Sequence, residues 1–238
     1  MRLQRQNSCS PVRPTPEGEG TSASAEESPD VRAQMVLRDV GRTEFFSDAV
    51  LAIGLTLLAL DLSITGYREA TLADRLLNLW PTYLAFLVSF IYVGVMWMNH
   101  HAAFDRLKAL SFPLQWANMG ILLGAVVLSF PTAVLAEAFQ NHNLSDERAA
   151  VVLYGLLAYA MGLSWWLFFL IILRNPHLWK HAGDHSKWRK VTIWAFYGSM
   201  GYLVAIAAGV LLDPRLALVL FFLLVFYRST QARRIATG

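Results

Sequence analysis

The sequence predicts an all-α membrane protein with six transmembrane helices per subunit and both termini in the cytoplasm. Of the 238 residues, 55% are hydrophobic and only 16% are charged, whereas a soluble domain carries about 25% charged residues. Long apolar segments recur along the chain, and none shows the alternating pattern of a membrane β-strand. Because only helices and closed barrels satisfy their backbone hydrogen bonds within a bilayer, we expect these segments to be helices.

Residues 1–34 precede the first apolar segment and are rich in Pro, Ser, Glu and Gly, without an aromatic residue. Such a segment buries too little apolar surface to fold alone, so we expect a disordered cytoplasmic tail. The first residues lack the apolar stretch of a cleavable signal peptide. Cys9 is the single cysteine, which excludes an intrachain disulfide and a cysteine-based metal site.

Six apolar segments follow, and they define a transmembrane domain over residues 35–230, with a short basic tail at 231–238. A helix of about 20 apolar residues crosses the hydrocarbon core, so the last segment is short for a span. The segments are residues 42–62, 80–101, 113–135, 149–173, 191–212 and 214–228.

Three prolines agree with this division. Pro81 and Pro214 fall at expected helix starts, where a missing N–H group costs nothing. Pro131 lies inside the third segment, where we expect a kink near the outer end of the helix.

Basic residues predict the orientation. Lys and Arg gather in both terminal segments, in the loop after the second segment and in the loop after the fourth. With six spans, these parts of the chain all lie on the same side of the membrane, and the positive-inside rule assigns that side to the cytoplasm. The opposite side has fewer basic residues, which acidic neighbours partly offset. The expected cytoplasmic residues are Arg32, Arg38, Arg42, Arg106, Lys108, Arg174, Lys180, Lys187, Arg189, Lys190, Arg228, Arg233 and Arg234.

One face of the first segment is mainly apolar. At 100° per residue, this face carries Phe46, Ala49, Ile53, Thr56, Leu57 and Leu60. Two interpretations remain open: packing against another helix or lipid, and a hydrophobic constriction formed where copies of the face meet around an axis. Thr56 either adds hydroxyl groups near the narrow point or bonds back to a carbonyl of its own helix.

A polar corner lies near the start of the same segment. Glu44 and Asp48 lie opposite the apolar face, with Ser47 to the flank. Asp48 is either solvated at the headgroup level or buried and paired with a cation, because an unpaired charge at membrane depth is costly. His100, His101 and Arg106 are the candidate partners. The two adjacent histidines point about 100° apart and cannot easily share a metal ion, so we expect no metal site.

The sequence lacks the motifs that are typical of other functional classes. There is no glycine-rich phosphate loop, no zinc-ligand spacing and no nucleophile constellation, so neither an enzyme nor a cofactor is expected. The net charge of +3 comes from short basic patches between apolar runs, which indicates orientation signals and not nucleic-acid binding.

The motif Arg42-x-x-x-Phe46-Ser47-Asp48, followed by AIGLTLLALDL on a first membrane helix, resembles the bacterial branch of the lysosomal potassium channels known as transmembrane protein 175. The six-helix layout and the stretch Trp97-x-x-His100-His101 are also similar to that family. The resemblance covers about residues 36–230 and excludes the tail.

The resemblance implies a homotetramer in which the first helix lines a pore. It assigns the constriction to Ile53, further pore-facing layers to Leu57 and Leu60, and potassium preference to Thr56. It also implies a buried supporting network of signature residues with a second-helix histidine. The members of this network are Arg42, Phe46, Ser47, Asp48 and either His100 or His101.

The leading hypothesis is therefore a passive, potassium-permeable cation channel in a bacterial plasma membrane, surrounded by lipid and assembled from copies of itself. The alternative is a proton-conducting or proton-coupled transporter that uses Asp48 and a second-helix histidine as a relay. A scaffold or membrane enzyme is the third class.

Overall fold

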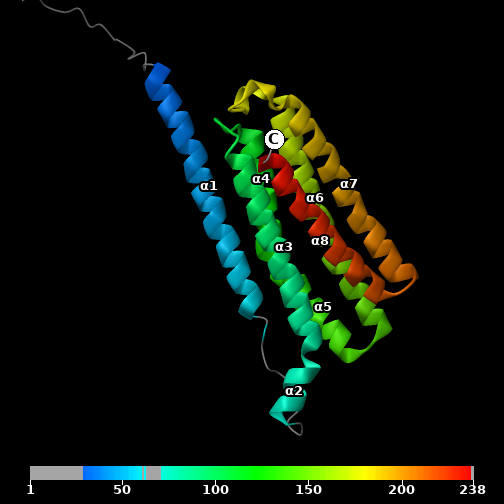
Figure 1. Ribbon diagram of the computed structural model, residues 1–238. Coiled ribbons are helices and arrows are strands. Elements are labelled where there is room, and N and C mark those ends of the chain that lie inside the picture. Colours follow the sequence, from blue (N-terminus) through cyan, green and yellow to red (C-terminus); the bar gives the residue numbers. More distant parts are fainter. Residues whose placement is uncertain (1–28, 61, 63–70, 237–238) are drawn as a thin grey trace, which may run out of the picture.

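The computed structural model describes residues 29–60, 62 and 71–236, and within these ranges it is built of helices without a β-strand. The described part of the chain is a bundle of long helices whose axes run side by side (Figure 1). Two short 3₁₀ turns, Pro176–Leu178 and Ala182–Asp184, lie between α6 and α7. The α-helices are α1 (Pro29–Leu60), α2 (Leu72–Asn78), α3 (Trp80–Phe104), α4 (Phe112–Val127), α5 (Ser129–Asn141), α6 (Leu144–Arg174), α7 (His185–Leu211) and α8 (Pro214–Ala236).

Five stretches of the described chain are long and apolar enough to cross a membrane: Val40–Leu60, Trp80–Phe104, Phe112–Asn141, Leu144–Arg174 and His185–Leu211. They correspond to the first five predicted segments. The sixth predicted segment lies within α8, which carries Arg228, Arg233 and Arg234 toward its end. α8 is not among the five candidate membrane spans. The chain is thus a multi-pass, all-helical membrane protein, and a sixth span remains a prediction.

The third span is interrupted near its middle, whereas Pro131 led us to expect a kink near the outer end. α4 ends at Val127 and α5 begins at Ser129. Proline has no N–H group, so Pro131 cannot donate to the carbonyl of Val127 one turn earlier. The helix resumes when the backbone N–H and the hydroxyl of Thr132 both donate to the carbonyl of Leu128, at 3.2 and 2.7 Å.

The helix ends differ from the expected domain bounds. Residues 1–28 of the predicted tail lie outside the described residues, but α1 already begins at Pro29, within the stretch assigned to that tail. At the other end, α8 continues to Ala236, through most of the predicted basic tail at 231–238.

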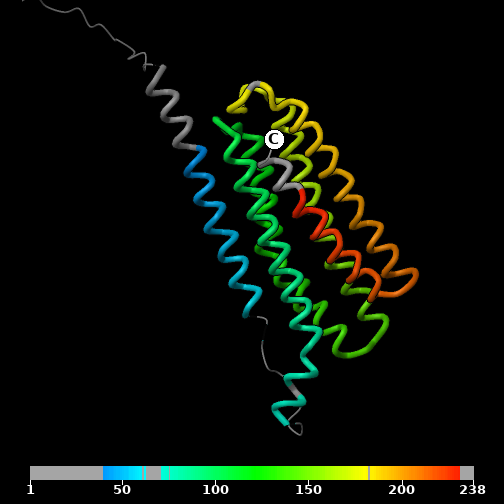
Figure 2. The backbone as a smooth tube through the Cα atoms, in the orientation of Figure 1, coloured from blue at the N-terminus to red at the C-terminus, as the bar shows by residue number. Residues whose placement is uncertain are grey.

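α1 stands at one edge of the bundle, where it packs against α3 and α4. The path of the backbone in Figure 2 places the α3–α4 connection and the α6–α7 connection at one end of the molecule. The two connections bind each other there, since the backbone N–H groups of Lys108 and Lys180 donate to the carbonyls of Leu178 and Arg106, both at 2.9 Å.

Candidate functional site

The buried and exposed faces of α1 separate clearly in the structure. Ser47, Leu51, Gly54 and Leu58 form the face buried against α3 and α4. Gly54 permits the close approach, because a Cβ atom there would lie only 3.3 Å from the carbonyl oxygen of Ala125 in α4. Ser47 therefore lies on the central buried face, and not on the flank where the helical wheel placed it.

The opposite face of α1 is exposed in the single chain. Its central row consists of Phe46, Ala49, Ile53, Thr56 and Leu60, and Ile53 and Leu60 are 55% and 75% exposed. The steps along this row alternate between three and four residues, which is the spacing that packs helices against one another in coiled coils. Leu57 is half-buried and lies beside this row.

The hydroxyl of Thr56 donates to the carbonyl of Ile53 at 2.7 Å. Back-bonding of this kind was one of the two sequence interpretations, here to the carbonyl three residues earlier. The bond uses the only proton of the hydroxyl, so its oxygen keeps lone pairs for another partner. The Thr56 hydroxyl can therefore bond back to its own helix and still present an oxygen acceptor at the exposed face, so the two sequence interpretations are compatible.

A buried chain of hydrogen bonds joins α1 to α4 and α3. The Ser47 hydroxyl donates to the carbonyl of Thr43 at 2.8 Å, so its oxygen accepts the bond from Asn118 Nδ2 at 2.9 Å. The other atom of the Asn118 amide, Oδ1, lies 2.9 Å from Nε2 of His100. An amide oxygen only accepts, so Nε2 must carry a proton, and a neutral His100 is the Nε2–H tautomer.

His100 is completely buried and stacks on Phe104, with ring centroids 4.2 Å apart. Its second nitrogen, Nδ1, has no hydrogen-bond partner among the described residues. Of the two candidate histidines, His100 is therefore the one connected to the signature serine, and the connection runs through an asparagine.

Asp48 has a neutral partner. The indole N–H of Trp97 in α3 donates to Asp48 Oδ1 at 3.0 Å. Asp48 is half-buried, and within the described part of the chain this indole is its hydrogen-bond partner, where one of the two interpretations expected a cation. Arg106, one expected partner, lies 3.5 Å from Asp184 instead.

The remaining predicted residues lie around these two contacts. His101 is half-exposed and its Nδ1 lies 3.0 Å from Glu44 Oε1. Arg42 and Phe46 are exposed and line an open hollow of about 570 Å³ beside Phe112, Trp116 and Asn118. The structure thus brings Ser47, Asp48, His100 and His101 to the contact of α1 with α3 and α4, and leaves Arg42 and Phe46 at its edge.

Sequence reasoning missed Asn118, which is the centre of the buried chain, and the roles of Glu44 and Trp97. The available signal for Asn118 was an amide within the apolar run of the third segment, because polar side chains in membrane helices usually bond to a neighbouring helix.

Comparisons with known proteins identify the family of the chain. The sequence profile of the family described as endosomal/lysosomal potassium channel TMEM175 matches residues 42–131. A protein of Streptomyces collinus named a potassium channel is 33% identical over 179 residues, which make up 75% of this chain and 86% of that protein. A protein of Gallus gallus named endosomal/lysosomal proton channel TMEM175 is 39% identical over 128 residues, or 48% of this chain and 25% of that protein.

A crystal structure of a lysosomal potassium-selective channel TMEM175 homologue from Chamaesiphon minutus has the same fold. It superposes with a TM-score of 0.71 and 30% identity, covering 82% of this chain and 98% of that chain. The fold and these relatives define the class: a multi-pass ion-channel protein and not an enzyme. Within that class, the chain belongs to the TMEM175 family, as the resemblance predicted.

Proposed function

We propose that the chain is a passive, potassium-permeable cation channel of the bacterial plasma membrane, formed by four copies around a central pore. The observation that carries this proposal is the exposed row of α1, an apolar helix face with coiled-coil spacing and no partner within the described chain. The relatives named potassium channels support K⁺ as the permeant ion.

In this proposal the four α1 helices converge with Ile53 at the narrowest point. An apolar ring offers no coordination, so K⁺ must shed part of its water there, and such rings gate by dewetting. The Thr56 oxygens, with free lone pairs, partly replace that water. Leu60 adds a further apolar layer, and Leu57, half-buried beside the row, supports it.

The hydrogen bonds to α3 and α4 hold α1 in one rotation about its axis. Asp48 is bound by Trp97 of α3, and Ser47 by Asn118 of α4. These two residues are neighbours in sequence and point in different directions, so their bonds together oppose rotation of the helix. The polar network thereby directs the Ile53 row toward the axis.

Both termini are cytoplasmic in this proposal. Basic connections support it, because the α3–α4 and α6–α7 connections and the end of α8 lie at one end of the bundle (Figure 1). Those connections carry Arg106, Lys108 and Lys180, and Lys187 lies in the first turn of α7; basic residues favour the cytoplasmic side.

The test is ion flux through the full chain reconstituted in liposomes. We expect Ile53→Asn to raise K⁺ flux and to change the ratio of K⁺ to Na⁺ flux, since a polar ring removes the dewetting barrier. Val204→Asn, an equally polar change at an exposed position of α7, is the matched control and should leave flux unchanged. Unaltered conductance and selectivity in Ile53→Asn would exclude the proposed constriction.

Proton conduction is the second candidate, because a relative in Gallus gallus is named a proton channel. Among the described residues Asp48 bonds to Trp97 and His100 bonds to Asn118, so the structure contains no direct Asp48–histidine bond. Proton flux that persists without K⁺, and that Asp48→Asn abolishes while the protein stays folded, would favour this candidate over the potassium channel.

A further inference from the structure

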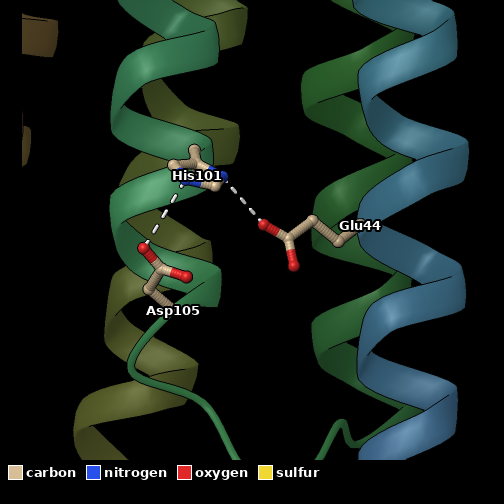
Figure 3. A group of neighbouring side chains, drawn as sticks. All are labelled: Glu44, His101 and Asp105. Carbon is tan, nitrogen blue, oxygen red and sulfur yellow. Dashed lines mark hydrogen bonds and ion pairs between the residues drawn. The ribbon is translucent and has the colours of Figure 1, made fainter.

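A compact group of ligating side chains lies beside the polar network but outside the proposed constriction. Glu44 of α1 faces His101 of α3, and Asp105 follows His101 by one helical turn (Figure 3). One ligand atom from each of these residues lies within 4.8 Å of the other two. We propose that Glu44, His101 and Asp105 form a binding site for a divalent transition-metal ion of the Zn²⁺ type.

The three side chains already point toward one another. Glu44 Oε1 lies 3.0 Å from Nδ1 of His101, and Asp105 Oδ2 lies 3.6 Å from its Nε2. Figure 3 shows the imidazole between the two carboxylates. The two carboxylates face different nitrogens of the ring, so the imidazole would turn one nitrogen toward both carboxylates to hold a single ion with them.

The charge of the group favours a cation. Two carboxylates face one imidazole, and Asp48 lies one turn further along α1 from Glu44. Among the described residues, Glu44 and Asp105 pair with the same side chain, His101, so the two carboxylates carry more negative charge than one imidazole can offset. A bound divalent ion compensates that charge.

The donor set selects the class of ion. Zn²⁺ and its neighbours bind imidazole nitrogen together with carboxylate oxygen, whereas Ca²⁺ and Mg²⁺ prefer shells made of oxygen. Three protein ligands leave room for water in the remaining position. The site is accessible to ions from solution, since the side chains of His101 and Asp105 are 53% and 62% exposed.

From the adjacent histidines we expected no metal site; in the structure His100 bonds to Asn118 and His101 faces Glu44. Adjacent residues alone did not indicate the proposed site, because one of its ligands is distant in sequence. Folding brings Glu44, which lies 57 residues before His101, to that histidine. A bound ion would join α1, through Glu44, to the C-terminal end of α3, where His101 lies and which Asp105 caps. Binding here does not depend on whether the chain is a channel.

The direct test is calorimetric titration of the full chain in detergent with Zn²⁺. We expect one ion per chain at this site, with binding weakened at least about tenfold by Glu44→Gln, His101→Gln or Asp105→Asn. His177→Gln, at an exposed histidine outside the group, is the matched control and should bind as the unmodified chain does. Ca²⁺ and Mg²⁺ at the same concentration should not compete.

A second measurement separates loss of the site from misfolding. Zn²⁺ should raise the thermal unfolding temperature of the unmodified chain and of His177→Gln, because an ion that binds only the folded state stabilises it. Asp105→Asn should unfold at the same temperature as the unmodified chain without metal and lose the Zn²⁺-dependent rise. Absence of Zn²⁺ binding by the unmodified chain, or full binding by His101→Gln, would overturn the proposal.

Discussion

His100 and His101 are adjacent in sequence but belong to different parts of the structure. His100 is buried and bonds to Asn118, whereas His101 is half-exposed and faces Glu44. Successive residues of a helix point about 100° apart, so the two rings necessarily meet different neighbours. The buried ring belongs to the network that holds α1, and the exposed ring belongs to the proposed metal site.

At the residue scale, we predict that Asn118→Ala lowers the free energy of unfolding by about 1–3 kcal/mol. The substitution removes both bonds of the amide, and it leaves the Nε2–H group of buried His100 without its acceptor. Thermal or denaturant unfolding of the detergent-solubilised protein measures the change. Gln115→Ala, an exposed position of the same helix, is the control, and equal stability of the two variants would contradict the prediction.

At the scale of elements, glycine decides how closely the helices pack. Gly209 of α7 lies where three helices meet, and a Cβ atom there would lie 2.7 Å from both Ala217 Cβ of α8 and Val151 Cγ1 of α6. The Cβ atom of Ala217 is fixed by its backbone, and a β-branched valine such as Val151 has little freedom about χ1 in a helix. The absence of a side chain at Gly209 is therefore a requirement of this contact, in keeping with the small residues that line membrane helix interfaces.

We accordingly predict that Gly209→Ala destabilises the protein by about 1–3 kcal/mol, the usual range for overpacking. Gly94→Ala is the matched control, because no atom lies within 4 Å of a Cβ atom built at Gly94. Alanine is the better helix former, so Gly94→Ala should be neutral or slightly stabilising. Comparable loss of stability in both variants would show that helix packing at Gly209 is not the cause.

At the scale of the whole molecule, α1 carries the least buried of the five candidate membrane spans. It packs on α3 and α4 on one side only, and its other face exposes Phe46, Ile53 and Leu60. Small residues on or beside that face, Ala49, Ala52 and Ala59, allow neighbouring helices to approach closely. Assembly through α1 follows from the proposed pore.

We predict that Ala52→Trp reduces the fraction of tetramer, because a large side chain beside the row overpacks a close helix contact. Native mass spectrometry of the protein in detergent measures the stoichiometry. Val204→Trp places the same side chain on an exposed position of α7 and should assemble normally. A tetramer fraction that is unchanged by Ala52→Trp would place the subunit contact elsewhere.

The sequence by itself determined the helices and the family. Apolar runs identify membrane helices because backbone groups in lipid must bond within their own segment, and Pro131 indicated a break in the third span because the break follows from one missing N–H group. Periodicity within the first segment also separated the row of Phe46, Ala49, Ile53, Thr56 and Leu60 from the polar corner, since both lie on one helix.

Only the tertiary structure decided which polar atoms meet. Ser47 and Asn118 are 71 residues apart and Asp48 and Trp97 are 49 residues apart, and a helical wheel gives directions relative to one axis only. The rotation and height of each helix depend on the packing of all its neighbours together. The partner of Asp48, the choice of His100 and the approach of Glu44 to His101 therefore follow from how the helices pack.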